Sequence, residues 1–460
     1  MKLEQLILQN YRCFEHLSID LHPELTVLIA PNGAGKTTVL DAARVAVWPF
    51  VKGFDLGSQT GKAANIHPLD VRMVQQADGN MEAQLPCQIT ATGKWSPDKL
   101  PDQWSQTRER IKAGTNTLQD AKTKKLTAYA EHLQEQVRTG QTDVTLPLIS
   151  YLGTSRLWYE GRFTSEAKDT VLDVNEYSRT SGYLNCLAYS SSFKAFTAWY
   201  GWVYRSYRES QLLALEKGTP LDETGQRFAH MIEVIKGAVD ALVKAATGWH
   251  GLEYSQRHNQ QLVMQHEKHG VLPVDMLSDG LRNAISMVAD LAFRAFKLNP
   301  HLGKEAAQKT LGIAMIDEVD MFLHPSWQQT ILGSLRVAFP KLQFIVTTHS
   351  PQVLTTVPRD NIRMLEEDDS GNIHARTPDF SPLAHESGDA LAKIMGTHRE
   401  PQLYLQDDIR QYEQWVRAGQ EHTPEAKSLR ATLAKAGYQF HESDLTTWRF
   451  LAARKSELKG

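Results

Sequence analysis

The stretch Ala30-Pro31-Asn32-Gly33-Ala34-Gly35-Lys36-Thr37-Thr38 decides the fold that we predict for this chain. It follows the apolar run Leu25–Ile29, which is typical of a buried strand, and it precedes Val39–Val47, which is typical of a helix. A Gly-rich turn in that position directs backbone N–H groups at phosphate oxygens, at the positive end of the helix. We therefore expect a nucleotide site, in which Lys36 reaches the β- and γ-phosphates and the Thr37 hydroxyl ligates Mg²⁺.

The loop departs from the usual phosphate-binding pattern at its first position, where Ala30 replaces glycine. We expect this change to be tolerated, because the backbone approaches the phosphates most closely at Gly33 and Gly35. The residues expected around the phosphates are Asn32, Gly33, Ala34, Gly35, Lys36, Thr37 and Thr38.

Composition places the chain among ordinary globular proteins. It has 460 residues, enough for two or three domains, with 41% hydrophobic and 22% charged residues. The formal net charge is −3, so no global field draws the protein to nucleic acid or to an acidic membrane. Cys13, Cys87 and Cys186 are scattered, which argues against structural zinc and a disulfide framework. Since no apolar run reaches the length of a membrane span and no signal-peptide pattern is found, we expect a cytoplasmic protein.

The pattern along the chain predicts an α/β fold, in which a mixed β-sheet core carries antiparallel N-terminal strands. Leu3–Gln9 and His16–Leu21 read as two antiparallel strands that lead into the strand before the phosphate loop. We expect five parts: 1–98 as the N-terminal part of the core, 99–145 as an inserted and mostly exposed helical arm, 146–275 as a helical lobe with flanking strands, 276–380 as the C-terminal part of the core, and 381–460 as a C-terminal helical extension.

Aromatic residues recur at helical spacing in the expected lobe. They would form either a platform for a partner or for nucleic-acid bases, or the packed core of the lobe, and the second interpretation is favoured. The residues are Phe193, Phe196, Trp199, Tyr200, Tyr204 and Tyr207.

A second motif, Leu277-Ser278-Asp279-Gly280-Leu281, stands at the head of a predicted helix. A Ser and a Gly in that place can offer a hydroxyl and backbone N–H groups to an anion. Alone, the motif is a common helix cap.

Two further motifs each end an apolar strand. Ala314-Met315-Ile316-Asp317-Glu318 ends in two carboxylates, and we expect Asp317 to hold Mg²⁺ beside Thr37 and Glu318 to polarise the attacking water. Val346-Thr347-Thr348-His349-Ser350 ends in a histidine that can hydrogen-bond the γ-phosphate or that water.

In this order the four motifs resemble the Walker A, signature, Walker B and histidine-switch elements of an ABC-type ATPase head. The long separation of Thr38 from Ser278 resembles the SMC, RecF and OLD branches, where the helical lobe is an insertion. The opening Leu6–Phe14 also resembles these branches, and this likeness implies that Arg12 approaches the nucleotide phosphates. Asp320 and the following Leu-His-Pro resemble the D-loop region of OLD-like ATPases.

Three stretches resemble the PtuA ATPase subunits of Septu-type anti-phage defence systems: Ser150–Trp158, Gly182–Leu187 and Ala390–Thr397. We expect this likeness to extend over nearly the whole chain. It implies that a separate HNH nuclease, PtuB-like, docks on the C-terminal helical region, and that contact with nucleic acid runs through the complex. OLD-like proteins often append a nuclease domain, but the acidic run Glu366–Asp369 reads as a hairpin turn, so we expect no nuclease in this chain.

The chain departs from the ABC pattern in two places. An ABC head carries a glutamine that helps to hold Mg²⁺, but the strand end where we look for it reads Tyr151-Leu152-Gly153, and Gln84 and Gln88 are weaker candidates. The signature reads LSDGL rather than LSGGQ. Asp279 would therefore bring a carboxylate close to the γ-phosphate, which can weaken closure or slow ATP turnover.

In an ABC head the signature reaches the phosphates of a second subunit, so the resemblance implies a homodimer or a larger homo-oligomer that encloses ATP. The function expected is that of an ATPase that regulates a defence nuclease. A RecF- or SMC-like DNA-maintenance ATPase, the motor of a membrane transporter and a scaffold clamped by ATP are the alternatives.

Overall fold

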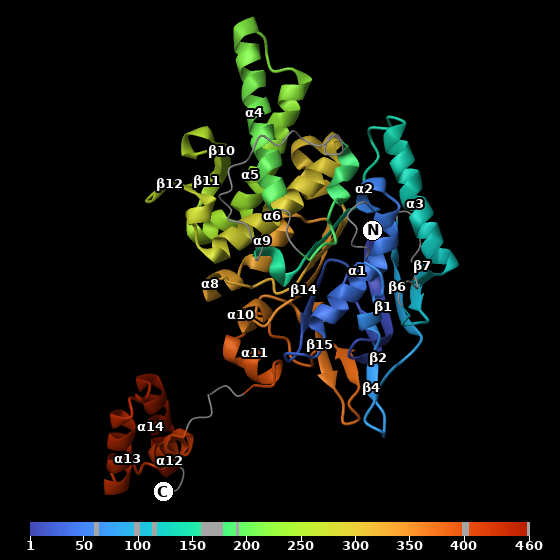
Figure 1. Ribbon diagram of the computed structural model, residues 1–460. Helices are drawn as coiled ribbons and strands as arrows, with labels where there is room; N and C mark the ends of the chain where they lie inside the picture. The colour runs from blue at the N-terminus through green and yellow to red at the C-terminus, as the bar shows by residue number, and fades with distance from the viewer. Residues whose placement is uncertain are drawn as a thin grey trace. The chain divides into compact units, whose positions relative to one another are not determined.

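The computed structural model describes residues 1–58, 64–95, 102–112, 117–157, 178–189, 193–397 and 404–457. These residues divide into two compact units, Met1–Met395 and Gly396–Gly460 (Figure 1). The division lies after the predicted boundary at residue 381, because helix α11 (Ser387–Lys393) packs on α10 (Pro351–Leu354) of the first unit and buries Ala390 there.

A six-stranded sheet forms the centre of the first unit, in the order β16-β15-β3-β14-β13-β9. All neighbours from β15 to β9 are parallel, and β16 pairs antiparallel to β15 as the predicted hairpin. The strands β3, β9, β13 and β14 are buried throughout, as expected for parallel strands covered on both faces. The bounds are β3 (Leu25–Ile29), β9 (Leu148–Leu152), β13 (Gly312–Ile316), β14 (Leu342–Thr347), β15 (Ile362–Glu367) and β16 (Ile373–Arg376).

A second, antiparallel sheet has the order β2-β1-β6-β7-β8 and contains the predicted N-terminal strand pair. Its bounds are β1 (Lys2–Tyr11), β2 (Phe14–Asp20), β6 (Cys87–Lys94), β7 (Asp102–Arg108) and β8 (Leu118–Gln119). The mixed-sheet α/β fold predicted from the sequence is confirmed.

Strand β7 corrects the prediction of an exposed helical arm over 99–145. Its buried face carries Trp104, Gln106 and Arg108, and the two polar side chains donate to the carbonyls of Val45 and Ile66. Because polar residues occupy inward positions, the apolar alternation that marks a strand is missing from the sequence. Helix α3 (Ala121–Arg138) is no free arm either, since it packs against α1 and buries part of one face.

Helix α1 (Lys36–Lys52) lies between the two sheets, in contact with β1 and β6 on one side and with β13 and β14 on the other. All its residues are buried except Thr37 and Lys52. A helix that is covered all round has a fixed position, so the loop at its N-terminus is held against the ends of the central strands.

The helical lobe consists of α4 (Phe193–Lys217), α5 (Glu223–Thr247) and α6 (Asp279–Leu298), with α4 and α5 forming a hairpin that projects from the unit (Figure 1). Four of the predicted aromatic residues, Phe196, Trp199, Tyr200 and Tyr204, are buried, and Tyr207 packs against the same core. The interpretation as packed core is confirmed for these residues, while the side chain of Phe193 lies outside the described residues.

The remaining elements complete the two units. In the first unit they are α2 (Asp55–Ser58), β4 (Met73–Gln75), β5 (Met81–Ala83), β10 (His250–Ser255), β11 (Gln261–His266), β12 (Gly270–Pro273), α7 (Ala306–Lys309), α8 (Pro325–Gln328) and α9 (Ile331–Ala338). The second unit contains α12 (Gln406–Arg417), α13 (Pro424–Lys435) and α14 (Glu442–Glu457), which share a core of their own around Tyr412 and Leu433. Within the described ranges, no helix has the length and apolar character needed to cross a membrane.

Candidate nucleotide-binding and catalytic site

The candidate site lies at one edge of the central sheet, where β3, β14 and β13 end side by side. The register pairs Leu28 of β3 with Thr347 of β14, and Val346 of β14 with Ile316 of β13. The phosphate loop, the two acids and the histidine follow these strands directly, so parallel pairing brings three segments from distant parts of the sequence together. This is the edge at which open α/β sheets bind ligands.

The phosphate loop has the backbone that its glycines predict. Gly33 and Gly35 adopt φ angles of 84° and 95°, which are strained for any residue with a Cβ. Lys36 donates to the carbonyls of Ala30 and Pro31 at 2.8 and 3.1 Å, so its ammonium lies inside the loop. Burial lowers the pKa of Lys36, and the nearby carboxylates of Asp317 and Glu318 oppose that shift.

Asp317 is held between two threonine hydroxyls. The Thr37 hydroxyl donates to Oδ2 of Asp317 at 2.9 Å, and the Thr347 hydroxyl donates to Oδ1 at 2.6 Å. The backbone N–H of Asp317 donates to the carbonyl of Leu152, the last residue of β9. Asp317 is 3% exposed, and its position is determined by the ends of two neighbouring strands, β14 and β9, and by the first turn of α1.

Glu318 has a left-handed backbone, with φ of 48°. Such backbone strain in a residue with a side chain is typical of active sites. Its N–H donates to the Thr347 hydroxyl at 2.7 Å, and the next N–H, of Val319, donates to the Thr347 carbonyl at 3.0 Å. The strained turn is thus fixed by two bonds to a single residue.

His349 is half-buried near these charges. Burial and the charge of Lys36 lower its pKa, against the opposing effect of Glu318, Asp320 and Asp317. The imidazole is therefore neutral at pH 7, and it can offer one donor and one acceptor to a phosphate or a water. The structure brings Lys36, Thr37, Asp317, Glu318 and His349 to one place, as the sequence predicts.

These residues fit Mg²⁺ and a triphosphate by the chemistry of their donors. Thr37 and Asp317 present hard oxygen atoms, 2.9 Å apart, beside an ammonium and a loop that begins a helix. Mg²⁺ needs only one or two protein ligands when phosphates and water complete its shell. The described residues contain no cluster of three or more His, Cys, Asp or Glu side chains that could hold a metal by themselves.

Arg12, the candidate phosphate ligand, forms two ion pairs with acids of its own chain. Its guanidinium contacts Asp41 of α1 at 2.6 Å and Asp70 at 2.8 Å, and both acids are buried. The backbone φ of Arg12 is 51°. Arg12 therefore lies beside α1, with its Nε and Nη1 atoms engaged by these two acids.

The signature segment begins α6 and is packed against the D-loop region. Ser278 and Asp279 are exposed, and Asp279 forms an ion pair with Arg282 in the next turn. Gly280 is buried, and a Cβ at this position would come within 2.3 Å of the Phe322 carbonyl oxygen. Asn283 also donates to the Met321 carbonyl at 3.0 Å, so a movement of the signature helix displaces the D-loop.

The glutamine candidates have other partners. Gln88 donates to the Thr107 hydroxyl at 3.1 Å, and Gln84 donates to the Glu82 carbonyl at 3.2 Å. No glutamine follows β9 within Gly153–Leu157, and residues 158–177 lie outside the described ranges. The metal-holding glutamine of the ABC pattern therefore stays unassigned.

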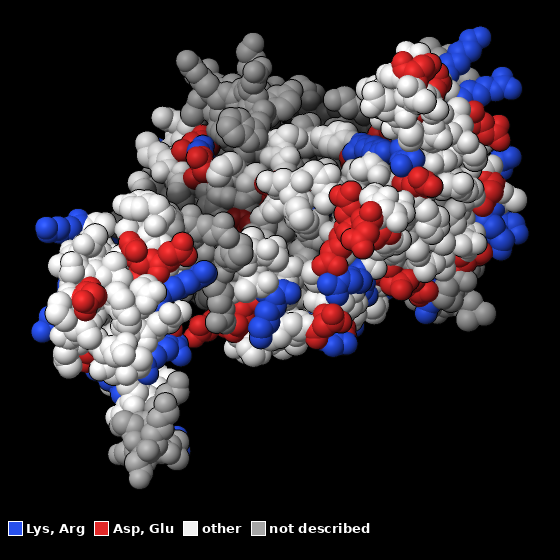
Figure 2. Space-filling view, turned by 90° about the horizontal axis from the view of Figure 1, so that it is seen from below, with Lys and Arg blue, Asp and Glu red and all other residues white. Residues whose placement is uncertain are grey.

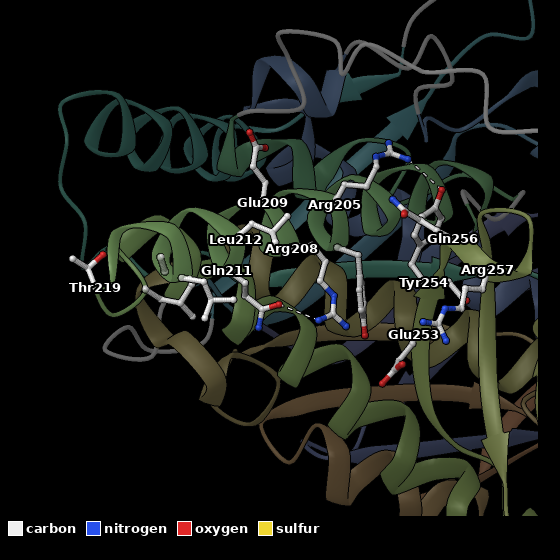
Figure 3. A pocket seen from close by; sticks show the side chains of 16 residues that line it. Arg205, Arg208, Glu209, Gln211, Leu212, Thr219, Glu253, Tyr254, Gln256 and Arg257 are labelled. Atoms are coloured by element: carbon white, nitrogen blue, oxygen red, sulfur yellow. Dashed lines mark hydrogen bonds between the residues drawn. The ribbon is translucent and has the colours of Figure 1, made fainter.

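A cavity of about 1380 Å³ lies elsewhere, along α4 and the end of β10 (Figure 3). Arg205, Arg208 and Arg257 line it, and Arg205 donates to the Tyr254 hydroxyl at 3.2 Å. None of the predicted site residues belongs to its lining, so this cavity is not the nucleotide site. On the face seen in Figure 2, acidic and basic side chains are intermixed, in keeping with the net charge of −3.

Sequence reasoning missed two residues of the site. Thr347 was quoted within its motif but given no role, and the buried ring of Phe14 packs against the phosphate loop, where a Cβ on Gly35 would lie 2.4 Å from it. Its place at the end of the strand parallel to the acid-bearing strand identifies Thr347 as a site residue once the register of the two strands is known.

Two family models match this chain. A family model described as "AAA domain" matches residues 5–213, and a second, described as "AAA domain, putative AbiEii toxin, Type IV TA system", matches residues 151–355. Between them, the two models include all four motifs.

Several relatives match over most of the chain, two of them as follows. The retron Vc95 probable ATPase of Vibrio cholerae is 25% identical over 484 residues, which is 95% of this chain and 87% of the relative. The OLD nuclease of Thermus scotoductus is 24% identical over 397 residues, 83% of this chain and 66% of that protein.

The likeness to PtuA is narrower than the sequence predicts. The Septu protein PtuA of Bacillus mycoides is 36% identical over 93 residues, which is 20% of this chain and 12% of that protein. The expectation that the PtuA resemblance extends over nearly the whole chain is therefore not confirmed. The matches support a broader likeness: the chain is similar to AAA-domain ATPases, among them a retron probable ATPase and an OLD nuclease.

Proposed function

We propose that the chain binds ATP with Mg²⁺, hydrolyses it and uses the cycle to control a partner in anti-phage defence. The convergence of Thr37, Asp317 and Glu318 at the ends of parallel strands carries the first part of the proposal. Lys36 and the loop N–H groups would bind the phosphates, and Thr37 and Asp317 would hold the metal ion, which neutralises charge that develops on the phosphate oxygens.

Glu318 would orient the attacking water and accept its proton. Its backbone N–H donates to the Thr347 hydroxyl, which fixes the turn that carries the side chain. His349, which is neutral at pH 7, would hydrogen-bond the γ-phosphate or the water.

We further propose that ATP joins two copies of the chain. Ser278 and Asp279 are exposed at the start of α6, where a helix N-terminus favours an anion. Met276 and Phe322, next to the signature and in the D-loop, are 72% and 48% exposed. Two apolar side chains in that position support an interface that forms when a second copy covers the phosphates.

The partner that we propose is a nuclease of the HNH class, which docks on the C-terminal unit 396–460. Support comes from the retron ATPase and PtuA relatives and from the separate core of that unit. A gene for a small HNH protein or a reverse transcriptase beside this one would support the defence role.

The experiment that tests the proposal compares Glu318→Gln with Glu209→Gln, which changes an exposed acid on α4. We expect Glu318→Gln to bind ATP as the wild type does, to lose hydrolysis by about 10²- to 10⁴-fold, and to remain dimeric with ATP in light scattering. Glu209→Gln should behave as wild type. Unchanged hydrolysis in Glu318→Gln would remove Glu318 from the catalytic role.

Two alternative functions give different results in the same assays. A RecF- or SMC-like DNA-maintenance ATPase would bind DNA in an ATP-dependent manner, with affinity falling steeply as salt rises. An ATP-clamped scaffold would hold ATP and dimerise without turnover in the wild type, and the carboxylate of Asp279 in the signature favours this second alternative.

A further inference from the structure

Thr347, the last residue of β14, contacts both acids that follow β13. Its hydroxyl donates to Oδ1 of Asp317 at 2.6 Å and accepts from the N–H of Glu318 at 2.7 Å. The side chain is 0% exposed, so no water competes for either bond. The single buried hydroxyl of Thr347 therefore contacts both acids. It donates to Asp317, the proposed metal ligand, and accepts from Glu318, which is proposed to orient the attacking water.

The two oxygens of Asp317 have unequal anchors. Oδ2 accepts from Thr37, whose hydroxyl is also the proposed metal ligand, so that bond weakens when Thr37 turns to Mg²⁺. Oδ1 accepts from Thr347, which has no competing task on the described residues. With Mg²⁺ bound, the Thr347 hydroxyl could still donate to Oδ1 and orient the carboxylate.

The same hydroxyl stabilises the strained turn at Glu318. A left-handed φ of 48° persists only where neighbours compensate for its cost. The Thr347 carbonyl accepts from Val319 N–H whatever side chain stands at 347, so removal of the hydroxyl isolates the bond to Glu318 N–H.

We propose that Thr347 is a positioning residue of the ATPase site: its hydroxyl orients Asp317 toward Mg²⁺ and holds Glu318 in the conformation that faces the attacking water. The inference deepens the proposed function and rests on it. Metal-ligand partners of this kind govern affinity through the ligand that they hold.

Three variants test the role. Thr347→Val keeps the shape and removes the hydroxyl, and Thr347→Ser keeps the hydroxyl. Thr26→Val is the matched control, because Thr26 is also 0% exposed on the neighbouring strand β3, pairs with Ile345 two positions before Thr347, and accepts a hydrogen bond from His22 N–H.

The first readout is Mn²⁺ binding, measured by electron paramagnetic resonance with the non-hydrolysable analogue AMP-PNP. We expect Thr347→Val to weaken Mn²⁺ binding by about tenfold, Thr347→Ser to restore most of the affinity, and Thr26→Val to leave it unchanged. In ATPase assays, Thr347→Val should lower kcat and raise the Mg²⁺ requirement while KM for ATP changes little.

The outcomes separate the inference from the proposed function. Wild-type protein without AMP-PNP-dependent Mn²⁺ binding and without hydrolysis would refute the proposed function and this role with it. Wild-type binding that Thr347→Val and Thr26→Val alter equally would refute the role of Thr347 alone, because a general effect on folding would then explain both.

Discussion

The hydroxyl of Thr37 donates a hydrogen bond of 2.9 Å to the carboxylate of Asp317, although 280 positions separate the two residues in the chain. The first residue belongs to the phosphate loop helix, and the second follows β13. The strands that bring them together are neighbours of β14, and the site exists only where all three strands are paired.

Gly35→Ala and Gly33→Ala form a matched pair that tests the loop. Both glycines have a positive φ, so each alanine should cost about 1–2 kcal/mol of unfolding free energy. At Gly35 the new Cβ would also lie 2.4 Å from the buried Phe14 ring, whereas at Gly33 nothing lies within 4 Å. Urea unfolding should therefore show a larger loss for Gly35→Ala, and equal losses would contradict this packing.

Arg12 and Asp70 provide a test of the phosphate-ligand role. Arg12→Ala leaves the buried Asp41 and Asp70 with fewer partners and should cost about 1–3 kcal/mol of stability. If Arg12 also reaches the phosphates, Asp70→Asn should release it and raise ATP affinity, whereas Arg12→Ala should lower that affinity. Titration with a fluorescent nucleotide measures the ATP affinity of both variants. If neither variant changes that affinity, Arg12 has a structural role alone.

Alkylation of Cys13 should block ATP binding. Cys13 is exposed, and its sulfur lies 2.8 Å from the position of a Cβ on Gly35, so an added group occupies the edge of the phosphate loop. Partial burial of its sulfur raises the pKa of the Cys13 thiol, so iodoacetamide should react slowly at pH 7 and faster as the pH rises. ATP should protect the protein.

Cys13→Ser is the control for this experiment, and it should bind ATP normally with or without iodoacetamide. Cys87 and Cys186 are buried, and burial raises the pKa of each thiol to about 12, so they should not react in the folded protein. Loss of ATP binding in treated Cys13→Ser would show that another residue is responsible.

Gly280→Ala should separate ATP binding from turnover. The new Cβ would lie 2.3 Å from the Phe322 carbonyl oxygen and must displace the D-loop, while the phosphate loop is untouched. We expect hydrolysis to fall by about 10- to 100-fold with near-normal ATP affinity. Gly237→Ala on α5, where nothing lies within 4 Å, is the control and should stabilise the protein by up to about 1 kcal/mol. Normal ATP turnover in Gly280→Ala would refute the coupling between the signature helix and the D-loop.

The central part of the fold could be predicted because local signals and long-range pairing agree there. Apolar runs of five or six residues that end in polar motifs predict parallel strands, and parallel strands gather their ends at one edge. The same logic predicts that Lys36, Asp317 and His349 lie close together.

Strand β7, the ion pairs of Arg12 and the role of Thr347 could not be predicted from the sequence. They depend on buried polar side chains or on contacts between residues far apart in the chain. Strand β7 lacks the alternation of apolar and polar residues that indicates a strand, because the polar residues Gln106 and Arg108 are buried and donate to backbone carbonyls. The ion pairs of Arg12 depend on how the loop that carries Asp70 folds back, which no periodicity encodes. The sequence around Thr347 indicates only a strand, and its position beside Asp317 follows from the register of β14 with β13.

The order β16-β15-β3-β14-β13-β9 has a consequence for synthesis on the ribosome. Strand β3 is made early, but both of its neighbours in the sheet, β14 and β15, lie more than 300 residues later in the chain. Until they emerge, the apolar segment Leu25–Ile29 has no sheet to join, and it is open to chaperones and to wrong pairing. A prematurely terminated chain that stops before Leu342 therefore lacks β14 and His349, and cannot form the nucleotide site described above.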